Sequence, residues 1–433
     1  MLKRKITEKL IKWKKNNNKK ALLVKGARQV GKSTSIKEFA KNHYKNVVVV
    51  DFVEQPEATI AFKGKLDADT VIRTLSVIGY GPFVEGETLV FFDEIQMCPN
   101  ARTAIKYLVQ DGRYDYIESG SLLGINYKEI RSFPVGFERT IEMFPLDFEE
   151  FLWARNIGEN ILEDIRRCYD NLIPVDKFEH NQMMKYFREY MYMGGMPSVV
   201  NVSLEKPDFA AVIGEQHALM ENYRNDISLY AGGEKTLAMN MFDKIPSQLA
   251  KISKRFILDD TEEGTTFDKY KDAAQWIVDA GVTYQCFQLT GLDLPLPVHE
   301  KRDFYKLYLL DTGLLCSEIT EGIQRAILFD NLAVNEGCIV ENAVAAALRQ
   351  SGKPLYYYDK KSRVEFDFCF MDNNKVSIIE VKSGKEYNTH ASLDKAVEMF
   401  GDKLNRRIVL SKNNVEVGSN GVIYLPLYMT MFL

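Results

Sequence analysis

Residues 26–33 form a complete phosphate-binding loop, and this loop constrains the fold more than any other segment of the chain. The eight residues read GARQVGKS. An apolar segment, ALLVKG, precedes them and an amphipathic segment, STSIKEFAKNHY, overlaps their end and continues the chain. A strand, a glycine-containing loop and a helix in this order turn backbone N–H groups and a helix N-terminus toward a phosphate. A glycine-containing turn without a ligand is the alternative, and the flanking strand and helix argue against it.

The loop predicts a binding site for ATP with Mg²⁺. The Lys32 ammonium would reach the β- and γ-phosphate oxygens, and the Ser33 hydroxyl would be a ligand of Mg²⁺. The residues expected to contact the nucleotide are those of the loop and the one that follows it: Gly26, Ala27, Arg28, Gln29, Val30, Gly31, Lys32, Ser33 and Thr34.

A second acidic motif follows about sixty residues later, in the segment TLVFFDE. Asp93 ends an uncharged run typical of a buried strand and would hold Mg²⁺ through water, whereas Glu94 would polarise the attacking water as the catalytic base. Alone, an Asp-Glu pair is more often a solvated strand end. The loop upstream gives it weight, and the presence of a base favours hydrolysis over simple binding.

The first 150 residues alternate between apolar strands and helical stretches, which predicts an α/β fold with a parallel sheet. The expected strands are ALLVKG, NVVVVDF, TLVFFDE, YDYIESG and RTIEMFPL. The loop and Asp93 then lie at carboxyl strand ends, where such sheets bind ligands. Ser119 or Ser121 in ESGS is placed to sense the γ-phosphate, and a serine-rich turn without a ligand is an equally good interpretation.

Composition indicates an ordinary globular protein of two or three domains. The 433 residues are 46% hydrophobic and 27% charged, with a net charge of −4, which excludes a disordered chain and a strongly basic nucleic-acid coat. The first twenty residues hold nine Lys or Arg, which we interpret as the solvated face of an opening helix rather than a phosphate-binding arm. Without a membrane span or signal peptide, we expect a cytoplasmic location and no membrane partner.

The middle of the chain reads as helical from residue 151 to about 235, broken at MGGMP, and we interpret this part as a helical lid. Residues 236–300 give two helical stretches and the strand-like VTYQCFQL, a weak winged-helix pattern. Lys251, Lys254 and Arg255 could face DNA there, although basic residues near a helix end are usually solvated. The predicted domains are therefore 1–150, 151–235, 236–300 and 301–433.

The last part contains two alternating strands around Asn373 and Asn374. If these two residues form a hairpin loop, positions that add to 747 face each other, which places Asp367 opposite Glu380. Two opposed carboxylates repel unless a cation or solvent relieves them. A Mg²⁺ or Mn²⁺ ion on Asp367, Glu380 and the Val381 carbonyl would do so.

The D…ExK spacing is the pattern of restriction-type nucleases, with Lys382 orienting a water for attack on a phosphodiester. A solvent-exposed sheet face with an ordinary Glu365–Lys382 ion pair explains this residue pattern equally well. On the upstream helix EGCIVENAVAAALRQ, Glu341 lies at the margin of the apolar arc. There it could reach the metal as a third acid, or extend to solvent, as glutamates at such margins more often do.

Taken together, these motifs resemble a known family. The segments GARQVGKS, FFDEIQ, ESGS, FPLDFEEFL, YMGGMP, KLYLLDTGLL, ENAVAAAL and VEFDF…IIEVKSG occur in the order seen in bacterial and archaeal AAA-type ATPases with a C-terminal domain of unknown function 4143. The resemblance implies an AAA-type core, a helical and winged-helix-like middle and a restriction-nuclease-like α/β end.

The same resemblance assigns a nucleotide site to Lys32, Ser33, Asp93 and Glu94, and a nuclease-like site to four residues of the last part: Glu341, Asp367, Glu380 and Lys382. It also makes Arg139 a catalytic arginine finger acting on a neighbouring subunit of a homo-oligomer, although Arg139 could simply pair with Glu138 or Glu142.

Two hypotheses remain open. In the first, the chain is an ATPase that acts with nucleic acid, DNA rather than RNA, and its last domain cleaves it. In the second, the last domain is a catalytically inactive binding or assembly module, and the ATPase is a nucleotide-controlled switch. Phosphoryl transfer to a small molecule gains no support from the sequence.

Overall fold

The computed structural model describes residues 1–16, 19–121, 134–206, 208–251, 254–257, 267–319, 322–329, 336–360, 364–384, 387–388 and 390–433. Packing divides the chain into two compact units, each with its own sheet. The first unit is Lys3–Phe144 with Asp279–Gly281, and the second is Met1–Leu2, Pro145–Val278 and Val282–Leu433.

The sheet of the first unit is parallel throughout, as the alternating pattern predicts. Its order is β2-β3-β4-β1-β5. Because β4 lies between β1 and β3, the three carboxyl ends meet at one edge of the sheet. All five strands occur where the sequence places them: β1 (Ala21–Gly26), β2 (Asn46–Asp51), β3 (Thr88–Asp93), β4 (Asp115–Ser121) and β5 (Glu138–Glu142).

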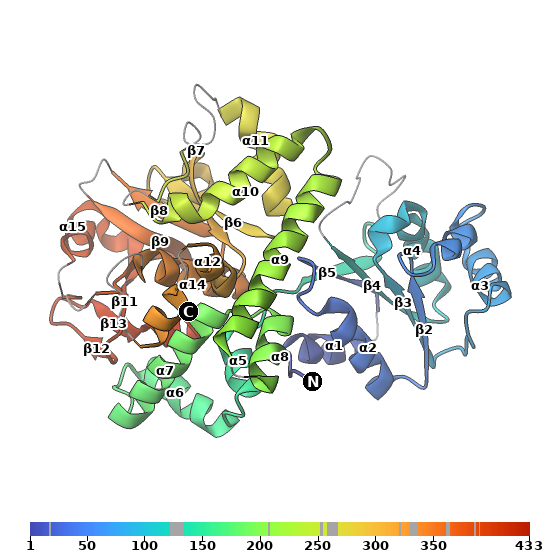
Figure 1. Ribbon diagram of the computed structural model, residues 1–433, viewed down its shortest axis with the longest axis horizontal. Coiled ribbons are helices and arrows are strands. Elements are labelled where there is room, and N and C mark those ends of the chain that lie inside the picture. Colours follow the sequence, from blue (N-terminus) through green and yellow to red (C-terminus); the bar gives the residue numbers. More distant parts are fainter. Residues whose placement is uncertain are drawn as a thin grey trace. The chain divides into compact units, whose positions relative to one another are not determined.

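The helices of the first unit are α1 (Ile6–Lys14), α2 (Lys32–His43), α3 (Ala68–Val77) and α4 (Pro99–Asp111) (Figure 1). Helices α3 and α4 contribute buried apolar residues to the core that includes strands of this sheet. Helix α3 begins where the Asp67 carboxylate accepts a hydrogen bond from the Thr70 N–H. The basic opening segment forms α1, which buries Leu10 and Trp13 and so agrees with the interpretation of its lysines as a solvated face.

The second unit begins with helices. Helix α5 starts with a capping box between Asp147 and Glu150. Rings of Phe148, Phe187 and Tyr190 pack against one another, so the aromatic stripe is core. The helices are α5 (Phe148–Ala154), α6 (Glu159–Asn171), α7 (Lys177–Met193), α8 (Pro197–Glu205), α9 (Phe209–Tyr230), α10 (Lys235–Leu249) and α11 (Phe267–Asp279). The long helix α9 runs beside α10 (Figure 1).

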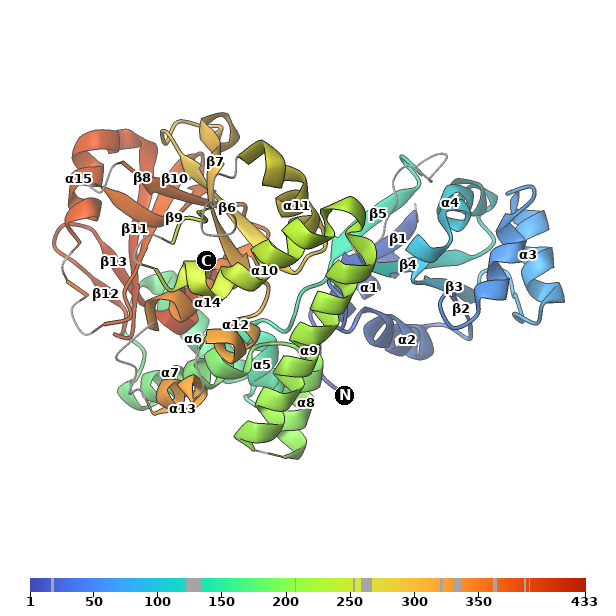
Figure 2. The ribbon, with the colours of Figure 1, turned by 45° about the horizontal axis from the view of Figure 1, so that its top comes forward.

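A mixed eight-stranded sheet forms the centre of the second unit, in the order β12-β13-β11-β10-β9-β8-β6-β7 (Figure 2). Its strands are β6 (Thr283–Leu289), β7 (Glu300–Leu309), β8 (Leu355–Asp359), β9 (Glu365–Asp372), β10 (Lys375–Val381), β11 (Leu404–Ser411), β12 (Glu416–Val417) and β13 (Ile423–Pro426). The later helices are α12 (Thr312–Ile319), α13 (Ile323–Leu328), α14 (Glu336–Gln350) and α15 (Ala391–Phe400).

Strand β6, the strand-like part of the predicted winged helix, belongs to this large sheet. It pairs antiparallel with β7 and parallel with β8. The sheet therefore runs across residue 300, where the sequence suggested a boundary. The finer division of the second unit into a lid, a winged-helix-like segment and a last domain stays a prediction.

The β9–β10 hairpin has the predicted register. Asn373 and Asn374 both adopt left-handed backbone angles, with φ of 50° and 60°, as a two-residue hairpin loop requires. Pairs from Lys375↔Asp372 to Ile379↔Phe368 all add to 747. The sequence thus predicted correctly which residues face one another along this hairpin.

Two consecutive glycines join three segments of the second unit. The Asp311 carboxylate accepts hydrogen bonds from the Gly195 N–H at 2.6 Å and the Leu314 N–H at 3.1 Å. The Leu146 N–H donates to the Gly195 carbonyl at 2.7 Å. Gly194 has φ of +78°, and a Cβ there would lie 1.9 Å from an Asp311 carboxylate oxygen. Only glycine fits this junction between the end of α7 and the start of α12.

We predict that Gly194→Ala destabilises the second unit by about 3 kcal/mol or more, because it combines a steric clash with an unfavourable φ. Thermal unfolding followed by circular dichroism would show a lower Tm. Gly214→Ala is the matched control, since Gly214 lies in α9 with no atom within 4 Å of the added Cβ. It should raise stability by up to about 1 kcal/mol. Equal Tm values for the two variants would contradict the conclusion that position 194 requires glycine.

Candidate functional site: a P-loop and an acidic cluster

The P-loop connects the end of β1 to the start of α2. Gln29 and Gly31 have left-handed φ angles of 64° and 92°, which curl the backbone between the strand and the helix. A Cβ on Gly26 would lie 2.2 Å from the Met143 carbonyl oxygen, so the loop also needs a glycine at its first position. Within the fully described stretch 19–121, no side chain caps α2. Its first N–H groups therefore lack a side-chain acceptor, as a phosphate site requires.

The Lys32 side chain folds back across this loop. Its ammonium donates to the carbonyls of Gly26 at 3.0 Å and Ala27 at 2.7 Å, and the residue is only 5% exposed. Burial lowers the pKa of Lys32 to about 8, although the nearby Glu94 and Asp93 carboxylates oppose the shift. In the absence of nucleotide, these two backbone carbonyls therefore bind the Lys32 ammonium that is expected to contact the phosphates.

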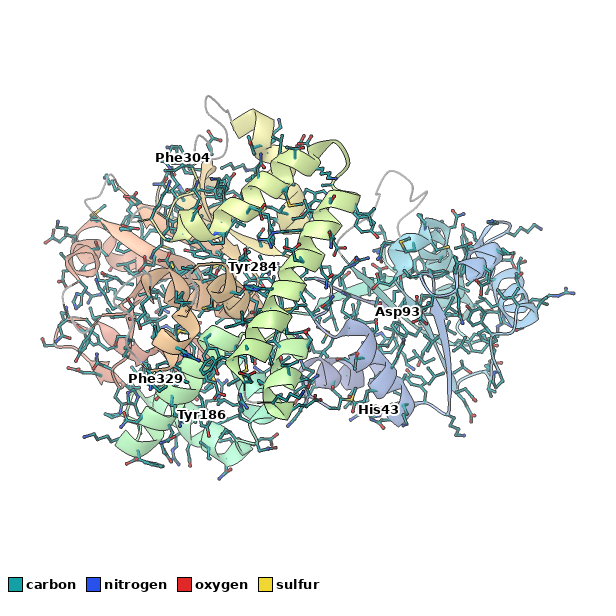
Figure 3. All side chains as sticks on the ribbon, in the orientation of Figure 1. His43, Asp93, Tyr186, Tyr284, Phe304 and Phe329 are labelled. Atoms are coloured by element: carbon teal, nitrogen blue, oxygen red, sulfur yellow. The ribbon has the colours of Figure 1, made fainter. Side chains whose placement is uncertain are left out.

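Asp93 ends β3 and is buried beside the start of α2 (Figure 3). The Ser33 hydroxyl donates to its carboxylate at 2.8 Å, and the Ser119 hydroxyl from β4 donates to the same oxygen. Lys37 on α2 approaches the other oxygen at 3.6 Å. The structure therefore brings together Ser33, Asp93 and Ser119, three of the residues that the sequence singled out.

Glu94 follows with a left-handed backbone at φ of 52°. Its carboxylate accepts a hydrogen bond from the Gln96 side chain, and the same amide donates to the Ser121 hydroxyl at 3.2 Å. Gln96 thus connects the predicted base to β4. Sequence reasoning missed Gln96 and Lys37, although Gln96 stands two residues after Glu94 and Lys37 lies one helical turn beyond Ser33.

This arrangement fits Mg²⁺ and ATP. A hydroxyl and a carboxylate 2.8 Å apart at the start of a helix supply oxygen ligands of the kind Mg²⁺ prefers. Arg28 is partly buried in the loop and Thr34 is exposed on the first turn of α2. Arg139 is exposed near the start of the edge strand β5, at the opposite end of the sheet from the loop, and Glu138 pairs instead with Arg102 at 2.9 Å.

The second group of predicted residues lies where the β9–β10 ladder ends. The Val381 N–H donates to the Asp367 carboxylate at 2.7 Å, so Asp367 lies beside Glu380. Lys382 pairs with Glu380 at 2.6 Å rather than with Glu365. Glu380 keeps one buried carboxylate oxygen without a hydrogen-bond partner in the described residues. Burial and then the charge of Glu341 raise the pKa of Asp367 to about 6.

Glu341 does not extend to solvent. It is 1% exposed on α14, and Lys306 of β7 donates to it at 3.0 Å. Lys254 and the Tyr308 hydroxyl also donate to this carboxylate. Burial by itself would raise the pKa of Glu341, but Lys306 and Lys254 lower it to about 2. The charged form is therefore held by two ammonium groups.

A divalent ion does not fit the Glu341 carboxylate in this arrangement, because lysine and tyrosine donors already engage both of its oxygens. Among the residues that the structure describes, no group of three or more His, Cys, Asp or Glu side chains could hold a metal ion. The predicted trio of Glu341, Asp367 and Glu380 is thus not arranged as a coordination shell. Sequence reasoning missed Lys306 and Tyr308, since they come from a strand distant in sequence.

Three family models match successive parts of the chain. Residues 18–152 match an AAA domain, residues 184–322 match a domain of unknown function, DUF8612, and residues 336–429 match the domain of unknown function DUF4143. The first match covers the P-loop sheet, and the third covers the β9–β10 hairpin with Glu341. In the described residues, no helix combines the length and apolar character required to cross a membrane.

A curated relative is an uncharacterized protein of Methanocaldococcus jannaschii. It is 22% identical over 410 residues, which span 90% of this chain and 82% of the relative. Similar solved structures include a Walker-type ATPase of Pyrococcus abyssi, with 14% identity, coverage of 73% of this chain and 96% of that one, and a TM-score of 0.44.

A second solved structure is the RuvB Holliday junction branch migration motor of Thermotoga maritima, with 12% identity, coverage of 65% and 89%, and a TM-score of 0.30. Because both TM-scores are below 0.5, we infer no property of this chain from either structure.

We predict that ATP binds more weakly as pH rises through about 8, because nucleotide-free Lys32 loses its charge there while bound phosphates raise its pKa. Above pH 8, affinity should fall by up to roughly tenfold per pH unit, and binding should take up protons. Isothermal titration calorimetry in buffers of different ionisation enthalpy measures both effects.

Lys37→Ala is the matched control, because Lys37 is an exposed lysine beside the same Asp93. This variant should keep the proton uptake, whereas Lys32→Met should lose it. Proton uptake that persists in Lys32→Met would assign the titration to another group.

Proposed function

We propose that this chain, which carries an AAA-type P-loop ATPase domain and a C-terminal DUF4143 domain, is a Mg²⁺-dependent ATPase. We also propose that it acts with nucleic acid, DNA rather than RNA. The observation that carries the proposal is the contact between Ser33 and Asp93 beneath the uncapped start of α2, with Glu94 next in sequence. A nucleotide-binding loop, a metal-holding pair and a base are the parts that hydrolysis of a γ-phosphate requires.

The residues of the site have separate roles in this proposal. The Lys32 ammonium exchanges the Gly26 and Ala27 carbonyls for phosphate oxygens and stabilises their charge. Ser33 and Asp93 would hold Mg²⁺, which would supply positive charge to the phosphates. Glu94 accepts a proton from the attacking water and Gln96 orients its carboxylate. Ser119 and Ser121 stand at the end of β4, from which a hydroxyl could contact the γ-phosphate.

Nucleic acid is proposed as the partner because cations and aromatic rings lie together in the second unit. Arg255 and Lys301 both lie over the ring of Phe304, at 4.5 Å and 3.4 Å from its centroid. Phe304 is on β7, two residues before Lys306, which pairs with Glu341 (Figure 3). Cations grouped with an aromatic ring suit phosphates and bases.

A second candidate is a nucleotide-controlled switch whose last domain binds but does not cut. The contacts of Glu341 with Lys254 and Lys306 favour it, because those ammonium groups already satisfy the acid that cleavage would use. Lys382, whose partner is Glu380, is the residue that separates the two candidates.

We predict that Glu94→Gln lowers kcat for ATP hydrolysis by roughly 10²–10⁴-fold while leaving ATP binding nearly unchanged, since only the base is removed. Lys32→Ala, in contrast, should weaken nucleotide binding in addition to lowering kcat. Steady-state phosphate release and equilibrium binding of labelled ATP measure the two effects, with Lys41→Ala, which changes an exposed lysine near the end of α2, as the control. Undiminished hydrolysis in Glu94→Gln would exclude this glutamate as the base.

For the partner, wild type, Lys32→Ala and Lys382→Ala are incubated with labelled single- and double-stranded DNA and RNA, with Mg²⁺ or Mn²⁺ and with or without ATP. Cleavage that only Lys382→Ala loses would support an ATPase with a nuclease domain. Binding of DNA without strand breaks would support the switch. No binding of any nucleic acid would contradict nucleic acid as the partner and would leave a switch for a protein partner.

A further inference from the structure

Two glutamates of the first unit lie on the same face of its sheet. Glu118 on β4 is in register with Leu23 of β1. Glu138 on β5 is in register with Ala21 of the same strand. Because Ala21 and Leu23 are two residues apart, and residues in register on parallel strands point to one side, both glutamates share that side. Ala21, Leu23 and residues of α4 belong to one core, so the two acids lie on the face that this helix covers.

The pair has fewer hydrogen-bond donors than two buried carboxylates require. Arg102 of α4 pairs with one oxygen of Glu138 at 2.9 Å, and both side chains are 10% exposed. Glu118 is fully buried, and in the described part of the chain no donor reaches either of its carboxylate oxygens. The second oxygen of Glu138 is also without a donor there. Arg102 therefore balances one negative charge of a pair that would carry two.

A proton on one of the two acids accounts for this arrangement. The two carboxyl groups are close enough to hydrogen-bond each other. An ionised carboxylate only accepts hydrogen bonds, so the bond forms only if one group is protonated and donates to the other. Burial and then the charge of Glu138 raise the pKa of Glu118 well above its ordinary value, although Arg102 opposes the shift. Burial raises the pKa of Glu138 too, but Arg102 and the hydrogen bond from Glu118 both oppose it, so Glu118 is the donor.

A proton fits this position, whereas a divalent metal ion does not. Beside Arg102, two ionised glutamates leave one excess negative charge, which a proton removes. A divalent ion would instead leave an excess positive charge in a buried region, where an unbalanced charge is costly. In the residues that the structure describes, no group of three or more His, Cys, Asp or Glu side chains could hold such an ion.

The charge on Glu118 depends on the groups around it, of which Glu138 and Arg102 act on it electrostatically. Other charged or titratable side chains lie on the same sheet face or on α4: Lys25 of β1, Lys106 of α4, Tyr116 of β4 and Glu142 of β5. Lys106 lies over the ring of Phe137 at 5.9 Å, and Lys25 and Glu142 are in register nearer the carboxyl ends of their strands. Among the described residues, Glu138 and Arg102 therefore set the charge on Glu118.

We propose that Glu118 and Glu138 hold one proton between them in the folded protein, and that this proton stabilises the contact of β4 with α4 and β5. In alkaline solution the proton passes to hydroxide or buffer, and the pair is left with two negative charges beside one arginine. Repulsion between the carboxylates then weakens the packing of the elements that carry them. The pair makes the stability of the first unit sensitive to pH. The inference does not rest on the proposed ATPase function.

The first test is the infrared spectrum of the full-length, nucleotide-free protein at pH 8. Wild type should show the C=O stretching band of a protonated carboxylic acid, and Glu118→Gln should lose it. Asp311 and Asp367 do not interfere, because their pKa values are raised only to about 6 and both are ionised at pH 8. Glu138→Gln should lose the band as well, since either substitution leaves one acid for one arginine. A folding failure of one variant therefore leaves the other to decide.

The second test is the pH dependence of unfolding in urea. Fluorescence of Trp13, which is buried in α1, reports the first unit when Trp153 and Trp276 are replaced by Phe in every protein compared. Unfolded glutamates lose their protons near about pH 4, whereas the folded pair keeps one. Because the folded state binds the additional proton, raising the pH favours unfolding until the folded pair has also lost it.

The folding equilibrium constant of wild type, divided by that of Glu118→Gln, should therefore fall by up to roughly tenfold per pH unit between pH 6 and the pH at which the infrared band disappears. Glu85→Gln is the matched control, because Glu85 is an exposed glutamate of the same unit. It should keep both the infrared band and the pH dependence of wild type.

Three outcomes would overturn the proposal. Wild type could lack the carboxylic acid band at pH 8, the band could survive in Glu118→Gln, or wild type and Glu118→Gln could lose stability in parallel as the pH rises. Neither test uses ATP or nucleic acid. A failure of the proposed function would leave the shared proton standing, and the reverse also holds.

Discussion

The position of β4 between β1 and β3 is the constraint on which the nucleotide site depends. Gly26 at the end of β1 is in register with Ser121, and Phe92 of β3 is in register with Glu118. Parallel pairing therefore brings the P-loop, Asp93 and both serines to one edge, although the chain separates them by tens of residues. Backbone hydrogen bonds set this geometry, and the side chains only complete it.

The second unit depends on a different interaction, which is compensation of buried charge. A buried carboxylate is costly without partners, and Glu341 has three donors from two separate segments. These contacts tie α14 to β7 and to the segment after α10, across the face of the mixed sheet. The Glu341 carboxylate therefore supports the packing of this unit, although its sequence context resembles an acidic catalytic motif.

Much of this architecture could be predicted because its signals are local. The apolar runs located all five strands of the first sheet, and the Asn373–Asn374 loop determined the hairpin register. Features that depend on contacts between distant segments could not be predicted from the sequence. The alternating pattern of β9 alone does not show that Phe366 stacks on Tyr358 whereas Phe368 contacts Tyr308. The register between β8 and β9 is also irregular, and no turn residue in the sequence indicates this irregularity.

The sequence by itself determined the P-loop, the acidic end of β3 and the register of the β9–β10 hairpin, because each follows from short-range spacing and the two-residue period of a strand. Only the tertiary structure decided that Gln96 holds Glu94, that β6 and β7 complete the eight-stranded sheet, and that Lys254 and Lys306 meet Glu341. Those contacts join segments up to 87 residues apart. The packing of helices and strands decides which distant cation neutralises a buried acid. The spacing of residues along the chain does not indicate it.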